Sequence, residues 1–131
     1  MTQAQLTTAG IGADIRAFVE AAHGRQTEFL RELVKVPSDN PSGDCAPHAA
    51  RAKALLEALG LTVEAHAVPE AQVRAVGMVS ATNLIVRHTF GNGGPTIAMN
   101  AHGDVVPPGL GWTHDPYGGE IVETEHGPTM F

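Results

Sequence analysis

The sequence predicts an α/β protein on the basis of three observations. Two segments, 14–36 and 48–59, repeat apolar residues at three- and four-residue steps, as amphipathic helices do. Three shorter segments, 61–68, 83–90 and 95–100, have the alternating or continuous apolar residues that are typical of strands. Connections rich in glycine and proline separate several of these segments. The predicted order is therefore α-α-β-β-β, followed by a long loop.

Signals at the ends of both helical segments support their assignment. Asp14 is a suitable N-cap for the first helix, and Pro37 ends it because the residue before a proline avoids helical geometry. Pro47 suits the first turn of the second helix, and Gly60 closes it as a residue able to take positive φ. Residues 1–13 are small and mostly polar, which predicts a flexible leader before the first helix.

The glycine-rich run Gly91–Gly94, between the second and third predicted strands, allows two interpretations. A phosphate-binding loop requires a helix immediately after it, so that the helix N-terminus faces the anion. A strand is predicted after this run, so we interpret it as a hairpin connection. Residues 69–80 carry mixed signals, with one helical turn expected around Glu70–Val73.

The composition argues against several classes of function. The 131 residues suffice for one domain that buries roughly two-thirds of its unfolded surface. A net charge of −6 argues against binding a nucleic acid backbone, which requires a basic face. No apolar run approaches the length of a membrane span, and the first ten residues lack the features of a signal peptide. The single cysteine, Cys45, excludes an internal disulfide and predicts a cytoplasmic location.

His102-Gly103-Asp104 is the strongest candidate for chemistry. The triplet follows the predicted strand 95–100. A neutral histidine ligates zinc well, and a nearby carboxylate can hold the ring and raise its basicity. The alternative is a hydrogen-bonded pair that only caps the strand. His23, His48, His66 and His88 are interpreted as surface or packing residues, whereas His114 and His126 lie in loops that could approach a site. The chain contains neither an HExxH pair nor a G-x-S-x-G nucleophile.

An ordered set of short motifs surrounds this triplet. They are Phe29–Val34 leading to Pro37-Ser38, Leu59-Gly60, Asn83–Val86, His102–Gly109, Gly111-Trp112 and Asp115–Tyr117. This set, between residues 27 and 121, resembles the N-terminal part of a family of zinc-dependent metallopeptidases and deacylases. That family includes acetylornithine deacetylase, succinyl-diaminopimelate desuccinylase, aminoacylase and carboxypeptidase G. One departure is Ala101, where many members have glycine.

The resemblance implies a role for each residue of the pair. His102 would ligate one metal ion, and Asp104 would be the catalytic carboxylate that orients it. Two zinc ions (cobalt or manganese are alternatives) would lower the pKa of a bridging water toward ~7 and polarise the scissile carbonyl. The substrates would be N-acyl amino acids or small peptides. Residues 14–131 would be the opening part of a three-layer α/β/α catalytic domain with a mixed sheet, without the other metal ligands, the glutamate base or the lid domain through which many members dimerise.

Two hypotheses follow from this resemblance. In the first, the chain is the N-terminal fragment of a metal-dependent amide hydrolase and is inactive alone, because a catalytic zinc site usually takes three protein ligands. In the second, it is a truncated, non-catalytic piece that self-associates through the open edge of its sheet or pairs with a separate remainder. A downstream D-x-K-G segment and glutamate pair in the coding sequence would favour the first hypothesis, and a stop codon after Phe131 the second.

Overall fold

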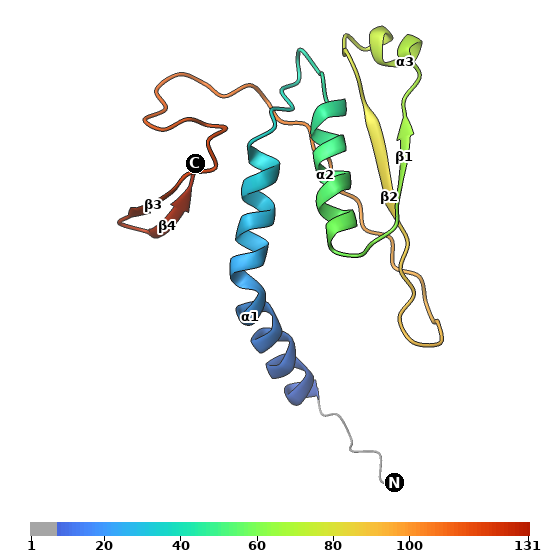
Figure 1. Ribbon diagram of the computed structural model, residues 1–131, viewed down its shortest axis with the longest axis vertical. Helices are drawn as coiled ribbons and strands as arrows, with labels where there is room; N and C mark the ends of the chain where they lie inside the picture. Colours follow the sequence, from blue (N-terminus) through green and yellow to red (C-terminus); the bar gives the residue numbers. More distant parts are fainter. Residues whose placement is uncertain (1–7) are drawn as a thin grey trace. The chain divides into compact units, whose positions relative to one another are not determined.

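The computed structural model describes residues 8–131, which divide into two compact units, 8–30 and 31–131 (Figure 1). Helix α1 (Thr8–Val34) forms the described part of the first unit and continues into the second. It begins six residues before the predicted N-cap, so residues 8–13 of the predicted leader are helical, and the rest of that leader lies outside the described residues. The helix ends at Val34, shortly before Pro37, as predicted.

The second unit contains helix α2 (Ala46–Ala58), which confirms the second predicted helix. Pro47 lies in its first turn, where the missing proline N–H costs no helical hydrogen bond. At the other end, the N–H of Gly60 donates to the carbonyl of Glu57, 2.9 Å away, and closes the last turn.

Strands β1 (Val63–Ala67) and β2 (Thr82–Val86) form an antiparallel pair in which Val63 lies opposite Val86. The expected helical turn is present in their connection as α3 (Glu70–Ala75). Helix α2 packs against both strands, and Figure 1 shows it alongside them. Ala49, Val63 and Val73 are the buried apolar residues of this unit. Helices with small antiparallel sheets confirm a mixed α/β protein, whereas the three-layer arrangement stays a prediction.

The third predicted strand, residues 95–100, is wrong. Between β2 and residue 120 the structure has only an isolated β-bridge at Val105 and no strand. Ile97 and Met99 are 83% and 93% exposed, so the apolar pattern finds neither a ladder partner nor a packing surface within the described residues. A strand requires a partner strand and a surface to pack against. The apolar pattern in the sequence indicates only the need for a packing surface. The glycine run contains a turn as expected, but it does not connect two strands of a hairpin.

A second antiparallel pair, β3 (Ile121–Thr124) and β4 (Gly127–Met130), was not predicted. Its two-residue connection is Glu125-His126, and Thr124 lies opposite Gly127. The Thr124 hydroxyl accepts from the N–H of His126 at 3.1 Å, which stabilises the turn. No helix within residues 8–131 is long and apolar enough to cross a membrane.

Candidate metal centre

The segment that carries His102 and Asp104 is joined to the loop that follows α1 by an isolated parallel β-bridge, Asp39 with Val105. The N–H of Asn40 donates to the carbonyl of Val105 at 2.8 Å, and the N–H of Val105 donates to the carbonyl of Ser38 at 3.1 Å. These two backbone hydrogen bonds place residues 38–40 beside the triplet. The loop after α1, and not the strand expected at residues 95–100, therefore positions the candidate site.

Ser38 adds a third connection between the same two segments. It is only 3% exposed, and its hydroxyl donates to the carbonyl of Gly103 at 2.6 Å. Gly103 is the middle residue of the triplet, so this hydrogen bond acts directly on the backbone between the two candidate side chains. Cys45 also contacts Ser38, because its thiol lies 3.8 Å from the Ser38 carbonyl oxygen. Burial raises the pKa of the Cys45 thiol, which keeps it in the less nucleophilic thiol form.

The structure brings His102 and Asp104 into contact. Nδ1 of His102 lies 2.9 Å from the Asp104 carbonyl oxygen and 3.1 Å from its carboxylate Oδ1. Because both partners accept hydrogen bonds, the neutral imidazole carries its proton on Nδ1 and leaves the Nε2 lone pair available. The His102 side chain is 84% exposed, and within the described residues Nε2 has no hydrogen-bond partner. His102 therefore fits the chemistry of a metal ligand through Nε2.

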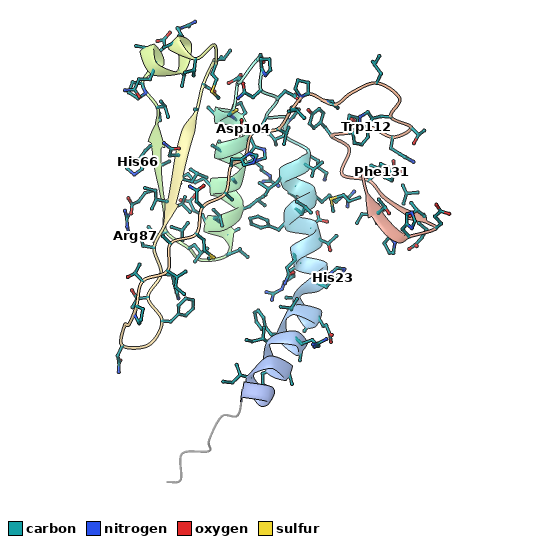
Figure 2. All side chains as sticks on the ribbon, turned by 180° about the vertical axis from the view of Figure 1, so that it is seen from behind. His23, His66, Arg87, Asp104, Trp112 and Phe131 are labelled. Carbon is teal, nitrogen blue, oxygen red and sulfur yellow. The ribbon has the colours of Figure 1, made fainter. Side chains whose placement is uncertain are left out.

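Asp104 is held in its ionised form by its neighbours. The Nδ2 amide of Asn40 donates to Asp104 Oδ2 at 3.1 Å, and this hydrogen bond is the largest cause that lowers the pKa of the Asp104 carboxyl. The contact with His102 lowers the same pKa further. An ionised carboxylate is the form that accepts the Nδ1–H of a metal-ligating histidine. Figure 2 labels Asp104, which lies on the segment between β2 and β3 that contains no helix and no strand.

His48 packs against the triplet, which the sequence did not indicate. Its Nδ1 lies 2.9 Å from the carbonyl oxygen of Val36, so the ring is held by the loop that follows α1. A Cβ atom at Gly103 would lie 3.2 Å from Cδ2 of His48. This distance is shorter than an ordinary contact, so the His48 ring would have to move. Glycine at position 103 therefore allows the close approach of the imidazole. This contact is consistent with the prediction that His48 is a packing residue.

The other loop histidines contact different groups. His114 Nδ1 lies 3.1 Å from Glu120 Oε2, and its ring lies 4.6 Å from that of Phe131. His126 lies in the turn between β3 and β4 and is 85% exposed. Within residues 8–131, no three His, Cys, Asp or Glu side chains gather closely enough to hold a metal ion. The described residues thus offer His102 as a single candidate ligand with Asp104 beside it.

Comparison with known proteins relates this chain to curated succinyl-diaminopimelate desuccinylases. It is 39% identical over 94 residues to the enzyme of Rhizorhabdus wittichii, covering 72% of this chain and 22% of the relative. It is 37% identical over 97 residues to that of Rhodospirillum centenum, covering 72% and 23%, and 38% identical over 96 residues to that of Acidiphilium cryptum, covering 72% and 22%. The chain belongs to the peptidase and deacylase family that includes these desuccinylases. The predicted family resemblance is confirmed.

The match to this family is partial in length. The chain spans less than a quarter of each of these relatives. No family model matches the chain, and no solved structure matches it. The names of the relatives support amide hydrolysis as the chemistry of the family members.

Proposed function

We propose that this chain contributes one metal-binding corner to a hydrolase that cleaves the amide bonds of N-acyl amino acids or small peptides. The observation that carries the proposal is the 39% identity to a succinyl-diaminopimelate desuccinylase, an enzyme named for removing an N-acyl group. The contact between His102 and Asp104 supports it, because an oriented imidazole next to an ionised carboxylate is a common metal-binding arrangement.

Each residue of the pair has a defined part in this proposal. His102 binds a metal ion through Nε2, and Asp104 accepts the Nδ1–H and so orients the ring. Zinc, in a two-ion site, is the metal we propose, with cobalt or manganese as alternatives. A metal ion bound there supplies the Lewis acidity that polarises the amide carbonyl.

We further propose that residues 14–131 form part of a three-layer α/β/α catalytic domain. This proposal is supported by the packing of α2 against β1 and β2, which is a contact between a helix and a sheet as in two adjacent layers of such a domain. We expect these residues alone to be inactive, because they supply one predicted ligand and a catalytic zinc site usually takes three protein ligands. Metal-dependent hydrolysis of N-succinyl amino acids by the purified chain would contradict this expectation.

A chimera tests the metal assignment. This chain replaces the matching segment of the Rhizorhabdus wittichii enzyme, and bound zinc and desuccinylation are measured. We expect His102→Ala to remove one ligand and therefore to lower both zinc content and activity. His126→Ala is the matched control, because its side chain is 85% exposed and that of His102 is 84% exposed. Zinc content and activity in the His102→Ala chimera equal to those of the control would contradict the assignment.

A second candidate function is a non-catalytic association segment. Exposed apolar side chains favour it, since Ile97, Met99 and Val106 are each more than 80% exposed. Large exposed apolar areas mark association surfaces in many proteins. Sedimentation velocity over a range of concentrations tests this candidate. Concentration-dependent assembly would support it, and a monomer at every concentration would argue against it.

A further inference from the structure

The carboxylate of Asp104 uses its two oxygens for two different partners. Oδ1 lies 3.1 Å from Nδ1 of His102, and Oδ2 lies 3.1 Å from Nδ2 of Asn40. A carboxylate that is held at one oxygen cannot rotate freely about its Cβ–Cγ bond. The Asn40 hydrogen bond therefore determines which way the other oxygen points.

We propose that Asn40 is a positioning residue that holds the Asp104 carboxylate against His102. It thereby favours the His102 tautomer with the proton on Nδ1 and the lone pair on Nε2. The proposal rests on the proposed function, in which Nε2 of His102 binds the metal ion. Asn40 does not contact the metal or the substrate in this scheme.

The backbone of Asn40 is itself well anchored. Its N–H donates to the carbonyl of Val105, the residue that follows Asp104, at 2.8 Å. The preceding residue, Asp39, forms the β-bridge with Val105 and accepts a hydrogen bond from the hydroxyl of Tyr117. The distance between Asn40 and Asp104 is thus set by paired backbones, so the side-chain amide loses little further conformational freedom on binding the carboxylate.

The chemistry of an amide suits this position. It donates a hydrogen bond to the carboxylate without adding a positive charge beside a cation site. Aspartate, which has nearly the same shape, presents an acceptor-only group and a negative charge to Asp104. Alanine removes the donor and leaves the backbone hydrogen bonds to Val105 in place. These two substitutions therefore separate the side-chain amide from the fold that presents it.

The test measures the tautomer of His102 by ¹⁵N NMR of the imidazole nitrogens in the full chain at about pH 8. We expect Asn40→Ala to shift the ratio of the Nδ1–H to the Nε2–H tautomer by about two- to fivefold, the size of one hydrogen bond. The Asp104 carbonyl, which remains 2.9 Å from Nδ1, keeps the shift from being larger. We expect Asn40→Asp to shift the ratio in the same direction, because the repelled carboxylate turns away. Asn92→Ala, at an exposed turn, is the control and leaves the ratio unchanged.

Hydrogen exchange of the Val105 amide distinguishes positioning from a general structural role. The proposal requires the tautomer ratio to change while the exchange rate of that amide stays within about twofold of wild type. An unchanged ratio in both variants would overturn it, as would a ratio that changes only together with loss of the Val105 hydrogen bond. Because neither measurement uses a metal or a substrate, failure of the proposed hydrolase function would show in the chimera and not here.

Discussion

Removal of the Ser38 hydroxyl tests how the candidate site is attached to the rest of the second unit. We predict that Ser38→Ala loosens the segment around Gly103 without unfolding α2 or the β1–β2 pair. The hydroxyl donates to the Gly103 carbonyl at 2.6 Å, within the usual range for a hydrogen bond between a hydroxyl and a carbonyl. Ser38 is 3% exposed, so water does not reach the place that the serine hydroxyl leaves empty in the alanine variant.

The expected magnitude follows from the two ends of this hydrogen bond. A typical intramolecular hydrogen bond contributes about 1 kcal/mol net, and an unsatisfied buried group costs about 1–3 kcal/mol. Gly103 is exposed, so water can solvate its carbonyl once the serine hydroxyl is gone. The cost therefore stays near the lower value, about 1 kcal/mol, which corresponds to about a fivefold change in a local opening equilibrium.

Native-state hydrogen exchange measures this effect at single amides. The amides of Asn40 and Val105 donate across the bridge between the two segments, so their exchange reports its opening. We expect both to exchange about fivefold faster in Ser38→Ala than in wild type. Ser42→Ala is the matched control, because Ser42 is an exposed serine of the same loop.

Equal exchange rates in the Ser38 and Ser42 variants would contradict a stabilising role for the Ser38 hydroxyl. That outcome would mean that the Ser38 hydroxyl does not measurably help to hold the triplet. A global loss of protection, which also reaches the β1–β2 pair, would contradict a local role for that hydroxyl. It would mean that Ser38 is needed for folding of the whole unit and not for one local contact.

Two further perturbations probe the surroundings of the site. Gly43 has φ of +71°, and a Cβ there would lie 2.8 Å from Cγ of Met78, so Gly43→Ala should destabilise the unit by about 2–4 kcal/mol in urea unfolding. Gly77→Ala is its control, because φ is +79° but nothing lies within 4 Å, and a loss as large as that of Gly43→Ala would contradict the clash. Tyr117, the only tyrosine, has a pKa raised to about 12 by burial and by its hydrogen bond to Asp39. Its neutral form is favoured in the folded state, so its stabilising contribution is full below about pH 10 and is lost as the pH rises through 12. Ultraviolet titration of the tyrosinate should give a midpoint that falls in Asp39→Asn, and a midpoint near 10 in wild type would show that the hydroxyl is free.

The elements that the sequence predicted well are those with local signals. Both main helices and the β1–β2 strands show periodicity within their own residues, and Pro37 and Pro47 mark helix ends directly. Residues 95–100 carry a local signal but form no strand. Their apolar pattern is that of a strand, but a strand exists only with a partner, and pairing depends on residues far away in the chain.

The candidate site shows the same division between local and distant information. His102 and Asp104 are two residues apart, so their spacing and the motifs around them could be found in the sequence. Asn40 is 64 residues from Asp104, and no local pattern connects them. The signal that pointed toward this loop was only its turn-forming composition, which predicts an irregular backbone but not the segment it pairs with.

The contrast between expected and observed support changes the interpretation of the site. A buried strand that ends at residue 100 would have positioned His102 by many ladder hydrogen bonds and apolar contacts. In the structure, two backbone hydrogen bonds, the Ser38 hydroxyl and the Asn40 amide hold the pair. Loss of the Ser38 hydroxyl changes the local opening equilibrium by about fivefold, whereas loss of the Asn40 amide changes the orientation of the Asp104 carboxylate. The orientation of the His102 ring should therefore respond to substitutions in residues 38–40 more strongly than to substitutions at Ile97 or Met99, whose side chains are exposed.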